Sequence, residues 1–255
     1  MTTVKETVDS GIAPIVLEFS KVNFFESDRK ILRSFLTVNS LDLGVLGYSQ
    51  YRFVARRTKV GNRLVRRHLE KLFRLLPDLL AKEPDITCVT VPVYARLLGE
   101  SELAEMLVDV SSLYPEVPLS RICIELSADI LYEDLEMASE KINELRNLGV
   151  KVAIFEVGDK FCPVFRLSEI AFDYAFMDVY STKSLENESA ERVAGSLVKY
   201  LHHLDAKVIA PGLDTEKKIE TAKALGTDGY TEDYPEGLYN EDYPEGLYAE
   251  GGADE

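Results

Sequence analysis

Short apolar segments alternate with amphipathic segments along most of this chain, and this alternation limits the fold more than any other feature. The apolar segments are rich in β-branched residues and are typical of buried parallel strands. They are Ile86 to Val93, Arg121 to Leu126, Val150 to Phe155, Tyr174 to Val179 and Lys207 to Ala210. Segments with an apolar period of about 3.6 residues predict helices around them: 60–76, 102–113, 131–148, 189–204 and 216–225. Repeated units of this kind predict parallel strands joined by helices.

The length of 255 residues fits one closed α/β barrel of the TIM-like (β/α)8 type. A doubly wound sheet is the alternative, although no Gly-x-Gly-x-x-Gly motif follows the first strand. Within the helix predicted over 60–76, His68 lies on the apolar stripe, so we expect a hydrogen-bonded core or interface residue. Pro77 is expected to end or kink this helix, and Gly149 is expected to end the helix predicted over 131–148.

Composition and charge exclude several classes of protein. The net charge of −15 repels nucleic acid and anionic lipid, so we expect no nucleic-acid partner. No run of 18 apolar residues occurs, so we expect no membrane span. The three cysteines are far apart and lack CxxC spacing, which argues against a disulfide framework and a thiolate zinc site. The N-terminus lacks the pattern of a signal peptide, so we expect a cytoplasmic protein.

The charge is distributed unevenly along the chain. Between Arg52 and Arg74 the basic residues are opposed only by Glu70, whereas the last residues, from Asp228 to Glu255, contain no Lys or Arg. The sequence Glu-Asp-Tyr-Pro-Glu-Gly-Leu-Tyr occurs twice there, at 232–239 and at 241–248. We interpret residues 232–255 as a flexible acidic tail. The alternative is a tyrosine-bearing docking motif or a pseudo-ligand for the basic helix.

Three acids follow or end predicted strands, where reactive groups lie in barrels of this type. They are Glu125, Glu156 and Asp178. Three converging carboxylates would bind Mg²⁺ or Mn²⁺ through oxygen ligands. The alternative is that each acid caps a helix or pairs with a nearby base, and the residues alone leave both interpretations open.

Six segments, in order, resemble the EAL domain, the family that hydrolyses cyclic di-GMP on a TIM-like barrel. They are 34–48 (the hairpin before the Glu-Ala-Leu signature), 91–97, 124–127, 145–154, 172–178 and 210–216. The match spans about residues 34 to 230, and the order and spacing of the motifs are more specific than any one of them. The resemblance implies a barrel whose carboxyl ends hold a two-metal centre.

Most site positions that the resemblance assigns are altered in this chain. Ser49 replaces the signature glutamate, Pro92 the metal-binding asparagine, Phe155 the first residue of an aspartate pair, Phe176 the active-site lysine, Pro211 a late glutamate and Asp228 a late glutamine. What survives is Glu125, Glu156 as a conservative replacement, and Asp178. The retained acids are too few for two metal ions, which need about four to six oxygen ligands.

Loss of one catalytic group commonly costs about 10²–10⁴ in rate, and here at least five are altered. We therefore predict no enzymatic activity, no catalytic residue, no bound metal and no cofactor. The predicted function is a protein-interaction or regulatory module in cyclic di-GMP-type signalling, with an unidentified regulatory protein as partner. A metal-independent cyclic di-GMP receptor is the alternative, and a residual phosphodiesterase is the third hypothesis.

Candidate ligand- or partner-binding residues are Arg52, Arg63, Arg66, Arg67 and Arg96. Tyr94, Phe155 and Phe161 either line the barrel mouth or fill the core. The loop at 156–165 supports dimers in the family, so a homodimer stays open.

Three regions are expected: an N-terminal extension (1–33), the EAL-like barrel (34–231) and the acidic tail (232–255). Within the extension, Ile12 to Phe25 predicts a strand or short hairpin, followed by a helix from Asp28.

Overall fold

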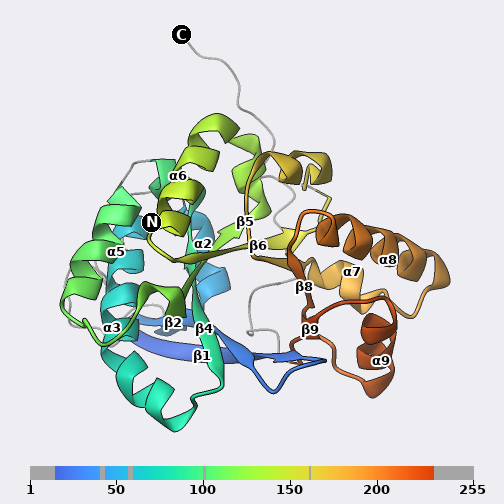
Figure 1. Ribbon diagram of the computed structural model, residues 1–255, viewed down its shortest axis with the longest axis horizontal. Helices are drawn as coiled ribbons and strands as arrows, with labels where there is room; N and C mark the ends of the chain where they lie inside the picture. Colours follow the sequence, from blue (N-terminus) through green and yellow to red (C-terminus); the bar gives the residue numbers. More distant parts are fainter. Residues whose placement is uncertain (1–14, 41–43, 57–59, 100–101, 161, 233–255) are drawn as a thin grey trace.

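The computed structural model describes residues 15–40, 44–56, 60–99, 102–160 and 162–232. Eight of its strands close into a barrel: β1 (Ile15–Phe24), β2 (Lys30–Ser40), β4 (Ile86–Val93), β5 (Ile122–Ser127), β6 (Lys151–Val157), β7 (Tyr174–Met177), β8 (Lys207–Ala210) and β9 (Gly229–Tyr230). The order around the ring is β1-β9-β8-β7-β6-β5-β4-β2, and β2 returns to β1 (Figure 1). The predicted closed barrel is confirmed, and the doubly wound alternative is excluded.

The direction of β1 departs from that of its neighbours. β1 runs antiparallel to both β2 and β9, whereas the ring from β2 through β4 to β9 is parallel throughout. A short strand, β3 (Gly44–Leu46), pairs antiparallel with the end of β2. The strand expected within 12–25 is therefore confirmed as β1, and it is one of the barrel strands.

The helix expected from Asp28 is wrong, because the chain forms β2 from Lys30 onward. Ser27 resembles a helix cap in sequence, but its hydroxyl accepts the backbone N–H of Arg29 and makes a turn between two strands. The apolar and β-branched residues of β2 then find partners on both sides, in β1 and β4. Tertiary pairing thus decides the conformation of a segment whose local pattern is ambiguous.

The helices outside the barrel are α2 (Tyr48–Ala55), α3 (Val60–Lys82), α4 (Ala95–Gly99), α5 (Glu102–Ser112), α6 (Leu135–Asn147), α7 (Val179–Lys183), α8 (Glu188–His202) and α9 (Glu216–Ala224). Five of them, α3, α5, α6, α8 and α9, agree with the predicted helices to within a few residues at most ends. The short helices α2, α4 and α7 were not expected from the sequence. Pro77 does not end α3, which continues to Lys82 because Leu79 and Leu80 still pack against the core. The segment predicted as one helix over 131–148 starts instead with a 3-10 turn. Asp134 then caps α6, and Gly149 follows it with a positive φ, as expected.

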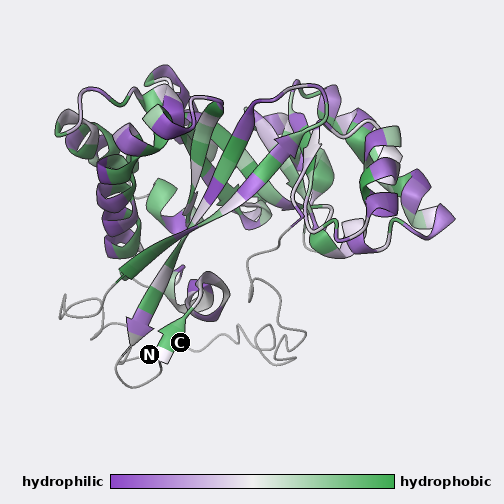
Figure 2. Ribbon diagram, turned by 90° about the horizontal axis from the view of Figure 1, so that it is seen from below, coloured by the Kyte–Doolittle hydropathy of each residue, from purple (hydrophilic) through white to green (hydrophobic). Residues whose placement is uncertain are grey.

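Two apolar cores follow from the alternation of side chains along the strands. The inward-facing residues of the barrel include Ile31, Cys88, Cys123, Phe155 and Phe176, which pack together in the interior. The outward-facing residues pack against the helices and form the larger core. Hydrophobic residues accordingly predominate along the barrel strands, whereas the helices carry both hydrophilic and hydrophobic residues (Figure 2). The barrel interior is therefore filled with side chains, and ligands have access only at its ends.

Candidate functional site

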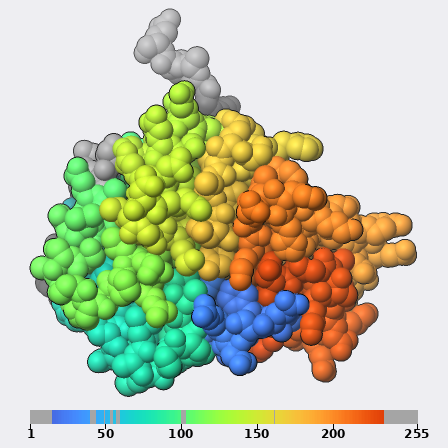
Figure 3. Space-filling model, viewed as in Figure 1, coloured from blue at the N-terminus to red at the C-terminus, as the bar shows by residue number. Residues whose placement is uncertain are grey.

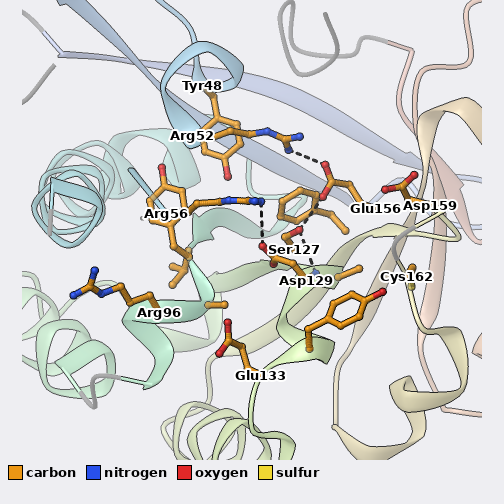
Figure 4. Close-up of a pocket in the computed structure, with 16 residues that line it drawn as sticks. Tyr48, Arg52, Arg56, Arg96, Ser127, Asp129, Glu133, Glu156, Asp159 and Cys162 are labelled. Atoms are coloured by element: carbon orange, nitrogen blue, oxygen red, sulfur yellow. Dashed lines mark hydrogen bonds and ion pairs between the residues drawn. The ribbon is translucent and has the colours of Figure 1, made fainter. Parts of the chain in front are cut away.

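A pocket of about 340 Å³ opens at the carboxyl ends of β4, β5 and β6 (Figure 4). α2 covers one side of it, and the loops after the three strands form the rest. Its lining consists of Tyr48, Arg52, Arg56, Val93, Tyr94, Ala95, Arg96, Ser127, Ala128, Asp129, Tyr132, Glu133, Phe155, Glu156, Asp159 and Cys162. The pocket lies where reactive groups are found in barrels of this class.

Gln50 and Tyr51, the two residues after Ser49, hold α2 in place. The side-chain oxygen of Gln50 accepts the backbone N–H of Gly47 at 2.8 Å, which closes the turn before the helix. The hydroxyl of Tyr51 donates to the carbonyl of Leu36 in β2 at 2.8 Å. These contacts fix α2 against the barrel, and they bring Arg52 to the pocket.

Glu156 is the one of the three acids predicted from the sequence that lines this pocket, and its backbone is strained. Its φ of 63° is left-handed, and it lies where the register of β6 against β7 shifts. One carboxylate oxygen accepts a bond from Arg52 at 2.7 Å and the other accepts the hydroxyl of Ser127 at 2.8 Å. The carboxylate of this residue with a strained backbone is thus held by an arginine and a serine.

A second ion pair crosses the same pocket. Arg56 donates to Asp129 at 3.4 Å. Burial raises the pKa of Asp129, and the charge of Arg56 opposes this shift. Burial also raises the pKa of Tyr48 and Tyr94 well above the usual value, so both phenols stay neutral. Among the lining residues, four acids face three arginines, and the pocket therefore carries no surplus of positive charge.

Glu125 lies below this pocket, inside the barrel, and binds an internal cation. Arg33 of β2 donates through Nε to one carboxylate oxygen at 3.1 Å and through a terminal nitrogen to the other. Thr90 of β4 adds a hydroxyl bond of 2.8 Å. The guanidinium carbon of Arg33 lies 4.5 Å from the ring centroid of Phe176, a cation–π contact. Both charged side chains are only 1% exposed, so this pair is sealed from solvent.

Asp178 has a different role again. It follows β7 and caps α7, where its carboxylate accepts the backbone N–H of Ser181 at 3.1 Å. In the part of the chain that the structure describes, no three His, Cys, Asp or Glu side chains form a group able to hold a metal ion. Each of the three acids thus caps a helix or pairs with a base, which is the second interpretation drawn from the sequence.

The altered family positions are spread over several parts of the barrel. Pro92, Phe155 and Phe176 are buried and contribute no ligand oxygen from their side chains. Pro211 is buried beside α7, and its carbonyl accepts the hydroxyl of Thr182 at 2.7 Å. Ser49 belongs to α2.

Asp228 lies at the opposite end of the barrel. It precedes β9 and accepts the backbone N–H of Val208 at the start of β8, at 2.8 Å. The fold therefore does not bring this position to the mouth.

The candidate binding arginines separate into two groups. Arg52 and Arg96 line the mouth pocket, whereas Arg63, Arg66 and Arg67 lie on the outer side of α3. Tyr94 and Phe155 line the pocket as predicted, and Phe161 lies outside the described residues.

Sequence reasoning missed Arg33 and Asp129, and it placed Arg56 with the basic surface of 56–74 and not at the mouth. A signal for Arg33 exists, because a lone charge inside the apolar run Ile31-Leu-Arg-Ser-Phe-Leu requires a buried partner if that run is a strand. Nothing comparable in the sequence marks Asp129, which reaches Arg56 only because α2 lies across the mouth.

The expected dimer loop borders a second, wider groove. The groove has a volume of about 870 Å³ and lies between the loop after β6, α7 and α8. Its lining includes Tyr180 and Val193, which are exposed apolar side chains. The homodimer stays a prediction. No described helix is long and apolar enough to span a membrane.

Comparison with known proteins agrees with this fold. Curated relatives include the cyclic di-GMP phosphodiesterase PdeB of Shewanella oneidensis, 20% identical over 74% of this chain and 22% of that protein. An uncharacterized signaling protein of Caulobacter vibrioides is 25% identical over 39% of this chain and 12% of that protein. The chain thus spans less than a quarter of the length of these relatives.

Solved structures agree over most of the chain. The PaMucR phosphodiesterase in complex with c-di-GMP superposes with a TM-score of 0.80 at 16% identity, covering 90% of this chain and 93% of that one. The FimX EAL domain from Pseudomonas aeruginosa bound to c-di-GMP gives 0.78 at 15% identity, covering 90% and 92%.

An EAL domain protein from Listeria monocytogenes gives a TM-score of 0.73 at 15% identity, covering 90% of each chain. At such identities these likenesses establish the fold alone. The model of the EAL domain family matches residues 29–231, which is most of the chain. The protein belongs to the EAL domain family.

Proposed function

We propose that this chain is an EAL domain without phosphodiesterase activity, which acts by binding as a regulatory module in cyclic di-GMP-type signalling. The observation that carries the proposal is the state of the retained acids. Glu125 is bound by Arg33 and Thr90, and Glu156 is bound by Arg52 and Ser127. Two guanidinium groups thus neutralise two of the carboxylates that the family resemblance assigns to a metal centre.

Metal binding at these acids would be opposed by the two arginines. Each guanidinium already neutralises its carboxylate, and a dication bound to the same carboxylate would lie beside a like charge. Arg33 is buried between Phe35 and Phe176, so its displacement would leave a guanidinium without a counter-charge in the interior. The residues present therefore do not fit a two-metal centre.

Hydrolysis is tested directly. The chain is incubated with cyclic di-GMP and Mn²⁺ or Mg²⁺, and the linear dinucleotide is separated by chromatography. We expect no product above the blank without protein. A phosphodiesterase of the family serves as the positive control, and the Glu125→Gln variant serves as the matched control. Sustained turnover that disappears in this variant contradicts the proposal, because contaminating enzyme would be unaffected.

The receptor hypothesis has one observation in its favour. The mouth pocket combines Arg52, Arg56 and Arg96 with Tyr94 and Tyr132, side chains of the types that contact phosphates and bases. The charge balance of the same pocket weighs against it. Arg52 and Arg56 each hold a carboxylate, and a dianionic ligand would have to break these bonds.

Calorimetric titration separates the two functions. Cyclic di-GMP is added to the whole chain with and without Mg²⁺, and the Arg52→Met variant is the control. Absence of heat supports the interaction module. Saturable heat at about micromolar concentration that Arg52→Met removes supports the receptor and rejects the first proposal.

A further inference from the structure

The outer face of α3 carries a row of basic residues. Arg63, Arg67, Lys71 and Arg74 follow one another at intervals of three or four, so they share one side of the helix. The other side buries nine residues in the core. At about 1.5 Å per residue the row is about 16 Å long. We call these four residues the α3 basic row.

The bases on this side of α3 outnumber the acids. The acids on the same side are Glu70, within the row, and Asp78, one turn beyond Arg74. Arg66, on the edge of the row, pairs with Asp109 at 3.5 Å. Within the described part of the chain, Arg67 and Arg74 have no ion-pair partner and are exposed. A row of like charges repels itself, so an acidic segment placed along it would be attracted.

The described chain ends near the same end of the barrel at which α3 begins. Thr231 follows β9 and is bonded to Gly212 and Leu213, which follow β8, so the chain leaves at the carboxyl ends of the strands. α3 begins beside Tyr94, at the carboxyl end of β4, as the close approach at Gly61 shows. β1 lies between β9 and β2, and α3 packs against β1 and β4. In Figure 3 the blue N-terminal strands lie between the teal segment that includes the end of α3 and the red C-terminal segment.

The segment that follows has the opposite charge and sufficient length. Residues 232–255 contain nine acids and no Lys or Arg, so this segment carries a formal charge of −9. The net charge of the whole chain is −15. The 23 residues after Glu232 can span about 75 Å when extended, several times the length of the row. In each Glu-Asp-Tyr-Pro-Glu copy, the first and last glutamates are up to about 13 Å apart. Arg63 and Lys71 are about 12 Å apart along the helix axis.

We propose that the acidic tail docks on the α3 basic row of its own molecule, through one Glu-Asp-Tyr-Pro-Glu-Gly-Leu-Tyr copy at a time. The tether gives each copy an effective concentration of about a millimolar, which compensates for the weakness of individual exposed ion pairs. Because the repeat occurs twice, two segments of the tail can make the same contact with the α3 basic row, one at a time. The tail therefore covers the basic row, and an acidic partner protein binds α3 only by displacing it. This inference goes beyond the proposed function, since it holds whether or not the domain hydrolyses a nucleotide.

Zero-length carbodiimide cross-linking of the full chain tests the contact, because this reagent joins a carboxylate to a lysine amine only when the two touch. Lys71 is the reporter in the row, and the exposed Lys199 and Lys217 on α8 and α9 are comparison sites in the same molecule. At low salt (about 20 mM) and low protein concentration we expect the monomer to contain Lys71 joined to tail carboxylates. The yield of this Lys71–tail cross-link should exceed the yield at the comparison lysines about fivefold or more. It should fall about tenfold in 0.5 M salt.

Charge reversal gives a matched pair of variants. Arg67→Glu/Arg74→Glu keeps the reporter Lys71 and should abolish its joining to the tail. Lys199→Glu/Lys217→Glu makes the same change in net charge elsewhere and should leave that yield unchanged. All four positions are exposed, and thermal unfolding of both variants verifies the fold. The proposal is overturned if Lys71 reacts no more than the comparison lysines, or if its tail products occur only in covalent dimers. A yield that survives Arg67→Glu/Arg74→Glu overturns it as well.

Neutralising the tail sharpens the result. Replacing the acids of one copy by their amides should lower the Lys71 yield by about half, because the other copy still docks. Replacing the acids of both copies should remove the yield. A yield that depends on the last residues, 250–255, and not on the two copies contradicts the assignment of the docking segment.

Discussion

Two arginine–glutamate pairs in this barrel have the same chemistry and different surroundings. Arg33 and Glu125 lie in the interior, each 1% exposed, with the guanidinium against Phe176. Arg52 and Glu156 lie at the mouth, 8% and 14% exposed, and border the pocket. In each pair a hydroxyl, from Thr90 or Ser127, completes the bonding of the carboxylate.

Burial accounts for the difference in what the two pairs do. Removing one partner of a sealed ion pair leaves a charge that neither water nor another group can solvate. At the mouth, water enters to solvate a residue whose partner is lost, and the cost is smaller. The interior pair therefore belongs to the fold, whereas the mouth pair is accessible to a ligand or partner.

The largest effect is expected from Arg33→Met. This change leaves Glu125 charged in an apolar interior, and we expect the free energy of unfolding to fall by about 3–5 kcal/mol. Chemical denaturation monitored by circular dichroism measures it. The double variant Arg33→Met/Glu125→Gln removes the orphaned charge and should regain at least half of the loss. A double variant no more stable than the single one contradicts the assigned role of the pair.

The second largest effect is a loss of stability at low pH from His68, which contacts Ser34, the residue after Arg33 in β2. Ser34 faces outward from β2 and contacts Nε2 of His68 at 2.7 Å, and burial lowers the pKa of His68 to about 3. Because the folded-state pKa lies below the unfolded value of about 6.5, the folded state binds fewer protons between these two values. Stability from this group is complete above about pH 6.5 and is lost as the pH falls toward 3.

By pH 4.5 the expected loss from His68 is about 2–3 kcal/mol. The measurement is the free energy of unfolding between pH 7 and pH 4.5, compared in the natural chain and the His68→Gln variant. The variant should retain a shallower slope from the remaining groups. Equal slopes in the two proteins would refute the low pKa of His68.

A smaller effect is expected at the mouth. Arg52→Met should lower the free energy of unfolding by about 1–2 kcal/mol, less than half of the effect of Arg33→Met, because Glu156 gains water when its partner is lost. The control is Arg67→Met, an exposed change outside both pairs, for which we expect less than about 0.5 kcal/mol. Equal losses at Arg33 and Arg52 would erase the distinction between interior and mouth.

The smallest effect is expected for a pair outside both regions. Arg66 and Asp109 lie 3.5 Å apart on the surface, 42% and 67% exposed. Asp109→Asn should change the free energy of unfolding by less than about 0.5 kcal/mol, and salt should reduce even that. Thermal unfolding of Asp109→Asn and the natural chain at low and high salt measures this difference in stability. A loss above about 1 kcal/mol would mean that exposure does not rank these pairs.

Much of the architecture followed from local patterns. The strand over Lys207–Ala210 and the helix over residues 216–225 were predicted to within one residue, because apolar periodicity and capping residues act over short distances. The segment from Asp28 was mistaken for a helix because β2 depends on pairing with β1 and with a strand more than 50 residues later. The sequence indicated that Glu125 and Glu156 lie at strand ends, but it did not indicate that Arg33 and Arg52 would be their ion-pair partners.

The sequence by itself determined most of the alternation of strands and helices from β4 to α9, the family resemblance and the charge contrast between α3 and the tail, since each is a property of neighbouring residues. The tertiary structure alone decided which cation neutralises which acid. Arg33 and Glu125 are separated by 92 positions, and Arg52 and Glu156 by 104. Closure of the barrel brings these side chains together, and no local pattern encodes the distance between residues on different strands.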